Sequence, residues 1–159
     1  TGKQLKSRAP VFFMSNAEVL ELTMALNSFF IMNYKKTMSL IETKLSEFLN
    51  DPRFKSFYIG QTNDFESSAE DHKNEGYNYV WKIAYSNDPA TIDQAEIDLI
   101  QYFKRNHVIA FENINGGGAG NKSNVVYVAV RAQIGHIDDL YDDAFDIDGL
   151  NIELPNVNE

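Results

Sequence analysis

Apolar residues recur every three to four positions over most of the first 50 residues, which is the spacing of one helix face. Ser15 followed by Glu18 is a capping box and predicts that a helix begins at residue 16. A second periodic segment, residues 36–49, is followed by Asn50-Asp51-Pro52, and proline cannot continue a helix. The pattern therefore predicts an N-terminal pair of helices.

Strand-like and helical segments alternate in the rest of the chain. Aromatic and β-branched residues predict strands over residues 55–60, 77–86 and 125–130. Helical patterns cover residues 66–74, with Gly76 as the C-cap, and residues 90–106. This order predicts an α+β fold, in which a small, mainly antiparallel sheet is flanked by helices and preceded by the N-terminal helical pair.

Three regions are predicted along the chain. Residues 1–15 are polar and basic and are expected to be a flexible N-terminus, in which residues 11–14 could form a short strand. Residues 16–135 are expected to form a single α+β domain. Residues 136–159 form an acidic tail with interspersed apolar residues, through which it either docks on the domain or stays mobile.

Charge and composition narrow the function classes only partly. The net charge is −9, but residues 136–159 hold eight of the 23 acids and no Lys or Arg, which leaves 15 acids against 14 bases in the rest of the chain. A nearly neutral body neither requires nor excludes binding to a phosphate backbone. Because the chain has no cysteine, disulfides and cysteine-based zinc sites are excluded. No apolar run has the length of a membrane span and no secretory pattern is visible, so we expect a cytoplasmic protein without membrane contact.

Three features carry candidate chemistry. Tyr58-Ile59-Gly60 ends a predicted strand, and the polar turn after it opens the helix that bears His72. Glu96 lies among apolar residues of the 90–106 helix and faces either solvent or a site, whereas Asp98 faces elsewhere on the helix. Taken alone, Tyr58 would be read as a core aromatic residue.

Together these features resemble the second half of a GIY-YIG nuclease domain, over residues 57–115. The resemblance implies a metal-dependent hydrolysis of phosphodiester bonds, with DNA as the expected nucleic acid. It assigns Tyr58 to activating or orienting water, His72 to proton relay or phosphate contact, and Glu96 to binding Mg²⁺ or Mn²⁺. One carboxylate can suffice, because Mg²⁺ keeps most of its waters and takes other ligands from phosphate.

The chain departs from that family at two points. The first tyrosine of the family comes from a strand that would lie near residues 44–50, and here that region has a helical pattern. Ser68 stands where the family has Arg or Lys on the helix before His72, and Lys82 is the candidate replacement for this cation. Without such a cation, transition-state stabilisation falls by several kcal/mol, so the nuclease would be weak or inactive.

The glycine-rich segment after the 90–106 helix allows three interpretations. Asn113 or Asn115 could be a positioning donor, and Gly116, Gly117, Gly118 and Lys122 could contact phosphate. A P-loop is disfavoured, because Asn121 replaces its last glycine and the loop precedes a strand rather than a helix. The third interpretation is a flexible surface loop.

The sequence thus predicts a divergent GIY-YIG-like endonuclease. The alternative is a non-catalytic interaction module on the same scaffold, which would bind a protein partner through its N-terminal helices or acidic tail. A homodimer is the other assembly that we consider, and the sequence indicates no surface for it. A nucleotide-binding protein that uses the glycine loop is the third hypothesis.

Overall fold

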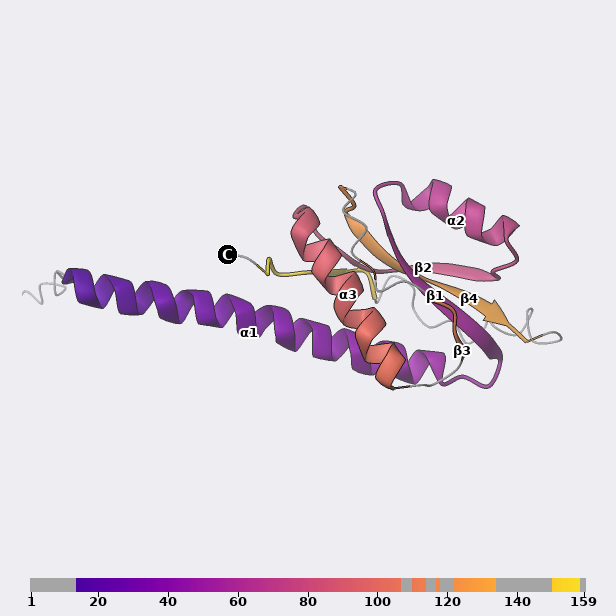
Figure 1. The fold of residues 1–159 in the computed structure, drawn as a ribbon, viewed down its shortest axis with the longest axis horizontal. Coiled ribbons are helices and arrows are strands. Elements are labelled where there is room, and N and C mark those ends of the chain that lie inside the picture. The colour runs from indigo at the N-terminus through magenta and orange to yellow at the C-terminus, as the bar shows by residue number, and fades with distance from the viewer. Residues whose placement is uncertain (1–13, 107–109, 114–116, 118–121, 134–149, 158–159) are drawn as a thin grey trace, which may run out of the picture.

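The computed structural model describes residues 14–106, 110–113, 117, 122–133 and 150–157. Three helices are present in this part of the chain: α1 (Asn16–Leu49), α2 (Phe65–Asn74) and α3 (Pro89–Arg105). Its five strands are β1 (Phe54–Thr62), β2 (Tyr79–Tyr85), β3 (Ala110–Phe111), β4 (Val125–Ala132) and β5 (Ile152–Glu153). The predicted α+β class is confirmed, and the sheet lies between helices on both of its faces (Figure 1).

The sheet has the strand order β3-β1-β4-β2-β5. β4 pairs antiparallel with both β1 and β2, and the two-residue strands β3 and β5 add parallel pairs at the edges. The sheet is therefore mainly antiparallel, as predicted. β1 and β2 do not pair with each other, so β4 joins the two halves of the sheet.

Side-chain alternation along β4 divides the core into two layers, because successive residues of a strand point to opposite faces. Val126, Val128 and Val130 pack with residues of α1 and α3 in the larger cluster. Tyr127 and Ala129 pack on the other face with Ala69 of α2. α1 and α3 thus cover one face of the sheet and α2 covers the other.

Both N-terminal segments predicted as helices are helical, and they form one continuous helix of 34 residues. Residues 32–35, between the two segments, contain neither glycine nor proline, so nothing in the backbone chemistry interrupts the helix. The predicted capping box is present: the Glu18 amide donates to Ser15 Oγ over 3.2 Å, and the Ser15 amide donates to Glu18 Oε2 over 2.8 Å.

Only the second half of α1 packs on the body of the protein. Its buried side chains follow helical spacing and join the larger core: Tyr34, Met38, Ile41, Leu45 and Leu49. The first half extends past the body as a single helix (Figure 1). The helix continues through Leu49, in the region where the GIY-YIG family would have its first strand.

The end of the chain takes part in the fold. Leu150 and Leu154 are buried in the larger core, and β5 pairs in parallel with β2. The Val157 amide donates to Thr91 Oγ1 over 3.1 Å, which ties this segment to the start of α3. The part of the predicted tail that the structure describes therefore docks on the domain. The short strand predicted for residues 11–14 falls outside the described residues except for Met14, which is not in a strand.

The described residues contain no helix that is long and apolar enough to cross a membrane. The remaining predicted elements lie within a few residues of the observed ones. Gly76, the predicted C-cap, has a φ of 97°, a conformation that glycine adopts without strain, and it follows the last turn of α2.

Replacing Leu150 with alanine tests the docking of the C-terminal segment. The Leu150 side chain is 1% exposed, so Leu150→Ala should lower the free energy of unfolding by about 2–5 kcal/mol through lost burial and a residual cavity. Urea denaturation measures the change, and the exposed neighbour Asn151→Ala is the control, with an expected effect within about 0.5 kcal/mol. Equal effects of the two variants would show that residues 150–157 do not pack as described.

Candidate active site

Aromatic side chains gather on the face of the sheet that α2 covers. Tyr58 of β1 and Tyr127 of β4 both pack against the His72 imidazole, with ring centroids 5.3 Å from it in both cases and 6.4 Å from each other. Tyr77 approaches the same imidazole edge-on at 5.2 Å. The strand-to-helix arrangement predicted around Tyr58 and His72 therefore brings the two side chains into contact, as the resemblance implies.

His72 connects Tyr127 to a carboxylate. Its Nε2 lies 2.7 Å from the Tyr127 hydroxyl, and its Nδ1 lies 3.2 Å from Glu75 Oε2. Because an ionised carboxylate only accepts hydrogen bonds, Nδ1 carries the proton in the neutral imidazole. Nε2 then accepts the hydrogen bond of the Tyr127 hydroxyl. The three groups form a chain Tyr127–His72–Glu75 in which a base touches a phenol and is oriented by an acid.

Gly60 makes the approach of the two tyrosines possible. A Cβ at this position would overlap the Tyr127 hydroxyl and ring, and it would lie 2.9 Å from Tyr58 Cε1. The strand passes this point with no side chain, so the Tyr127 ring leans across β1. Sequence inspection identifies Gly60 only as the end of a strand; it is in fact inside β1, which continues to Thr62.

Glu96 is buried on α3, on the other face of the sheet from the tyrosines. Its side chain is 5% exposed, so of the two predicted orientations, toward solvent or toward the inside of the protein, the structure shows the inward one. Gln61 Nε2 donates to Glu96 Oε1 over 3.0 Å. Gln61 follows Gly60 on β1, so the carboxylate is held beside the same short stretch of strand as the tyrosines.

An oxygen without a partner lies next to this carboxylate. Gln61 Oε1 is buried and accepts no hydrogen bond from any described residue. Gly117, with a φ of 83°, packs against Glu96 so closely that a Cβ there would be 2.9 Å from Glu96 Oε1. The carboxylate, the orphaned amide oxygen and the backbone of the glycine-rich segment therefore meet at one place.

The two faces interact electrostatically around Gly60. Burial raises the pKa of the Tyr58 phenol, and the Glu96 and Glu75 carboxylates raise it further. Burial also raises the pKa of Tyr127, followed by the effects of Tyr58 and the same two carboxylates. Both phenols therefore stay protonated at neutral pH, so that each is a hydrogen-bond donor rather than a phenolate base.

Asn113 is committed to the backbone of β1. Its Oδ1 accepts from the Ile59 amide over 2.7 Å, and its Nδ2 donates to the Ile59 carbonyl over 2.6 Å. These bonds continue the edge of the sheet beyond β3 and fix the start of the glycine-rich segment beside the site. Asn113 is thus placed at the site as a structural clamp, and its amide is not directed at a substrate.

The other site residues predicted in the glycine-rich segment are partly outside the described residues. Asn115, Gly116 and Gly118 lie outside the described residues, and Lys122 is exposed. Ser123, the hydroxyl of the P-loop alternative, is 2% exposed and stands just before a strand, so it cannot meet a nucleotide-bound cation. Gly117, the predicted phosphate-contact glycine that the structure describes, packs against Glu96.

Ser68, which stands at the expected arginine position, is engaged in a hydrogen bond within the domain. The Ser68 hydroxyl lies 2.7 Å from Thr62 Oγ1 and links α2 to the end of β1. Lys82 places its ammonium 5.1 Å from the centre of the Phe65 ring, and that ring contacts Tyr127 at a centroid distance of 6.4 Å. Lys82 also pairs directly with Tyr127 across β2 and β4, so the predicted replacement cation lies beside the tyrosine cluster.

Residues of the site that were missed from the sequence include Gln61, which contacts Glu96, Glu75, which contacts His72, and two residues of β4. Tyr127 supplies the second phenol. Arg131 lies four residues after Tyr127, so its side chain points to the same face of the sheet. Its guanidinium carbon is 3.9 Å from the centre of the Tyr77 ring, and its Nε donates to Glu112 Oε1 over 3.2 Å. The alternation of the predicted strand 125–130 places Tyr127 on one face, but only the pairing of β4 with β1 shows which face that is.

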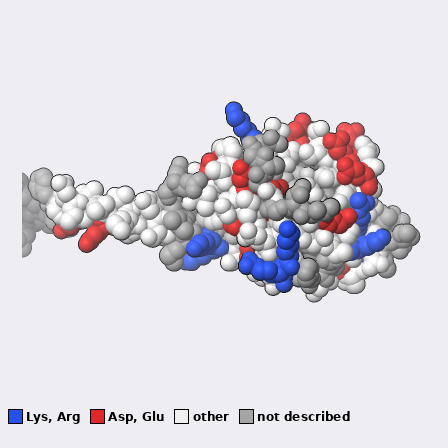
Figure 2. Space-filling view, in the orientation of Figure 1, with Lys and Arg blue, Asp and Glu red and all other residues white. Residues whose placement is uncertain are grey.

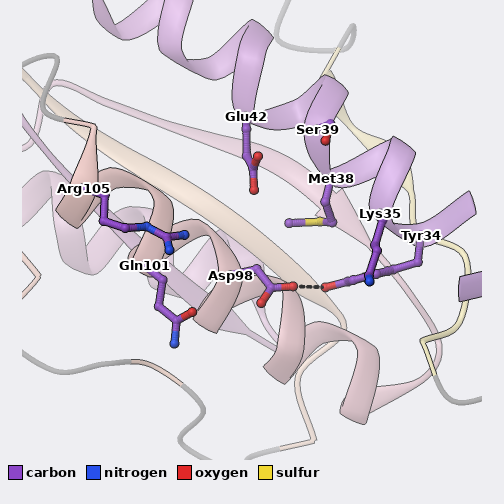
Figure 3. A pocket seen from close by; sticks show the side chains of 8 residues that line it. All are labelled: Tyr34, Lys35, Met38, Ser39, Glu42, Asp98, Gln101 and Arg105. Atoms are coloured by element: carbon purple, nitrogen blue, oxygen red, sulfur yellow. Dashed lines mark hydrogen bonds between the residues drawn. The ribbon is translucent and has the colours of Figure 1, made fainter. Parts of the chain in front are cut away.

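A separate cleft of 270 Å³ lies between α1 and α3 (Figure 3). Tyr34 donates a hydrogen bond to Asp98 Oδ2 over 2.9 Å across it, and Glu42 and Arg105 also line it. Asp98 thus points away from Glu96, as predicted. Burial raises the pKa of Glu42, and the Asp98 carboxylate adds to this effect while Arg105 opposes it. The cleft is a mixed-charge surface feature separate from the tyrosine site.

Clusters of three or more His, Cys, Asp or Glu side chains that could hold a metal are absent from the described part of the chain. Glu96 and Gln61 Oε1 nevertheless offer two oxygen donors, and Mg²⁺ requires no more protein ligands than that when water and phosphate complete its coordination. The donor chemistry of this pair fits a hard divalent cation.

Comparisons of the chain with protein-family models, curated proteins and solved structures found no match in any of the three. The site itself therefore has to carry the functional inference.

A double-mutant cycle tests the close approach at Gly60. Gly60→Ala should lower the free energy of unfolding by about 1–3 kcal/mol, because the added methyl group overlaps the Tyr127 ring. In a Tyr127→Ala background the cost should fall by about 1 kcal/mol or more, since the two sites then no longer interact. Urea denaturation of the four proteins measures both values. Additive effects would mean that the ring does not cross β1 at Gly60.

Proposed function

We propose that this domain is a divergent GIY-YIG-like endonuclease that hydrolyses phosphodiester bonds, with DNA as the expected substrate. The cluster of Tyr58, Tyr127 and His72 packed against Gly60 on one face of the sheet supports the proposal, and Glu96, held by Gln61 on the other face, is the candidate cation ligand. Phenols, an imidazole and a carboxylate are the groups that water activation and phosphate charge stabilisation require.

Tyr127 supports the proposal because it supplies a second tyrosine, which the resemblance calls for. The resemblance calls for a tyrosine from a strand that pairs antiparallel with the Tyr58 strand. β4 is such a strand, and Gly60 pairs directly with Tyr127. β4 follows β1 in the chain, whereas the resemblance would place the strand with the other tyrosine before β1. The proposal therefore requires that these two strands occur in the opposite order here.

Glu96 and Gln61 Oε1 would hold the divalent cation, Mg²⁺ or Mn²⁺. Such a cation, when bound, supplies Lewis-acid stabilisation of the charge that develops on the phosphate. The Gly117 backbone packs on the carboxylate and limits its movement. Gln61 uses its amide group to orient Glu96, and its carbonyl oxygen lies free of described partners beside it.

The two phenols have different roles: one donates a hydrogen bond and the other transfers a proton. Tyr58, held protonated, orients water or a phosphate oxygen by donating a hydrogen bond. Tyr127 passes its own proton to His72 Nε2 as it takes one from the attacking water. Glu75 stabilises the imidazolium that results. This assigns the relay to Tyr127 and His72, and an orienting role to Tyr58.

Substrate would approach along the β1 edge. Figure 2 shows acidic side chains gathered over α2, where Glu66, Glu70 and Asp71 are exposed. These carboxylates repel phosphate, whereas Asn113, which binds the β1 backbone at Ile59, carries no charge. With serine at position 68, the site lacks one preorganised cation, so the proposed activity is weak.

Cleavage of plasmid and single-stranded DNA in the presence of Mg²⁺ or Mn²⁺ tests the function. Glu96→Gln should abolish cation-dependent cleavage, and Tyr127→Phe should slow it by about 10²–10⁴-fold, the usual contribution of a proton-transfer group. Ser68→Arg should raise the rate, by up to about 10²–10³-fold if the added guanidinium acts as a preorganised donor.

Asp98→Asn is the matched control, because it removes a carboxylate from the same helix at a site that contacts Tyr34 instead. Its cleavage rate should equal that of the unmodified protein. Equal rates for Glu96→Gln and the unmodified protein would contradict the nuclease proposal. So would the absence of cleavage by the unmodified protein and by every variant, Ser68→Arg included.

A non-catalytic interaction module is the second candidate, and the exposed apolar first half of α1 favours it. Such a module needs neither a divalent cation nor Glu96. Partner binding that is unchanged in Glu96→Gln, together with absent cleavage, would support this alternative.

A further inference from the structure

The first half of α1 exposes more apolar surface than a solvated helix normally does. All described side chains from Met14 to Ser28 are exposed, and Leu20 and Met24 are 61% and 59% exposed. Glu18 and Glu21 are the only charged residues between positions 14 and 34. A helix with apolar residues around most of its circumference is normally buried against another element. The projecting half of α1 therefore lacks a partner among the described residues.

One apolar stripe runs along the side of α1 that faces away from the body. Val19 and Leu26 are seven residues apart, Leu22 lies between them at helical spacing, and Leu40 falls on the same heptad position two repeats later. All four are 48–49% exposed. Leu40 is exposed even though Met38 and Ile41 beside it are buried in the core, which identifies the stripe as the outer face.

A second line of apolar residues, Leu20 and Met24, continues the row of Tyr34 and Met38 that faces the body. A partner helix on that line would meet the domain itself at Tyr34, which hydrogen-bonds to α3. The outer stripe meets no such obstruction as far as Leu40.

Charges along α1 are arranged asymmetrically. The acids Glu18 and Glu21 lie near its N-terminal end, and the exposed bases Lys35 and Lys36 lie where it reaches the body. Figure 2 shows the projecting helix as a mostly uncharged rod with acidic side chains on it and basic side chains at its base. A parallel pair would place like charges together, whereas an antiparallel pair places acids against bases at both ends.

We propose that the outer face of α1 binds the same face of a second copy of this chain, with the two helices antiparallel. Centred near residue 27, this pairing sets Glu18 of each copy beside Lys36 of the other and Met14 beside Leu40. The overlap of residues 14–40 is about 39 Å long at 1.5 Å per residue. The contact is self-complementary, as a twofold interface requires.

Disulfide cross-linking tests the pairing, because the chain contains no cysteine of its own. Mixing Glu18→Cys protein with Lys36→Cys protein under mild oxidation should give a covalent dimer. Neither variant should cross-link alone, because positions 18 and 36 are about 27 Å apart along one helix and each faces the other only in an antiparallel pair. Cross-linking by either variant alone, or none in the mixture, would overturn the proposed arrangement.

Sedimentation equilibrium at several concentrations tests the surface independently. Leu22→Lys should weaken dimerisation about tenfold or more, which corresponds to about 1.4 kcal/mol. Leu20→Lys places the same charge on the other side of α1 and should leave dimerisation unchanged. Far-ultraviolet circular dichroism confirms that both variants keep their helix. A monomer at all concentrations would overturn the proposal and assign the stripe to another protein or to a lipid surface. Equal effects of the two substitutions would overturn the choice of face.

Discussion

The position of β4 at the centre of the sheet is the constraint on which the rest of the structure depends. β1 and β2 do not pair with each other, and β4 holds both of them through antiparallel hydrogen bonds. All of its side chains except that of Arg131 are buried. This one strand supplies the valines of the larger core on one face and Tyr127 on the other, so that core and candidate site share a single element.

A missing side chain at Gly60 turns this sheet into a site. Two faces of a sheet are ordinarily separated by the strand and its side chains. At Gly60 the Tyr127 ring packs directly on the strand backbone, and the next residue, Gln61, points to the opposite face and holds Glu96. Burying a carboxylate is costly unless it is hydrogen-bonded or bound to a cation, and the Gln61 amide supplies such a hydrogen bond to Glu96, which is 5% exposed.

Local chemistry predicted most of the elements from the sequence. The capping box at Ser15, the glycine after α2 and the alternating strands all specify short segments, and the fold class followed from their order. Long-range pairing is not encoded in this way. The partnership of Tyr58 with Tyr127 depends on the β1–β4 register, and the clamp between Asn113 and Ile59 joins residues 54 positions apart. The continuity of α1 was missed because its exposed apolar residues blur the periodicity that marks helix ends.

We propose that Glu96 and Gln61 hold a divalent cation on the α3 face of β1, next along the strand from Gly60. The most direct measurement follows the side-chain amide signal of Gln61 and the backbone signals of Gly60 and Gly117 by NMR during a Mg²⁺ titration. A saturable shift of these signals that disappears in Glu96→Gln is the expected result. No shift at these residues, or the same shift in Glu96→Gln, would contradict the claim.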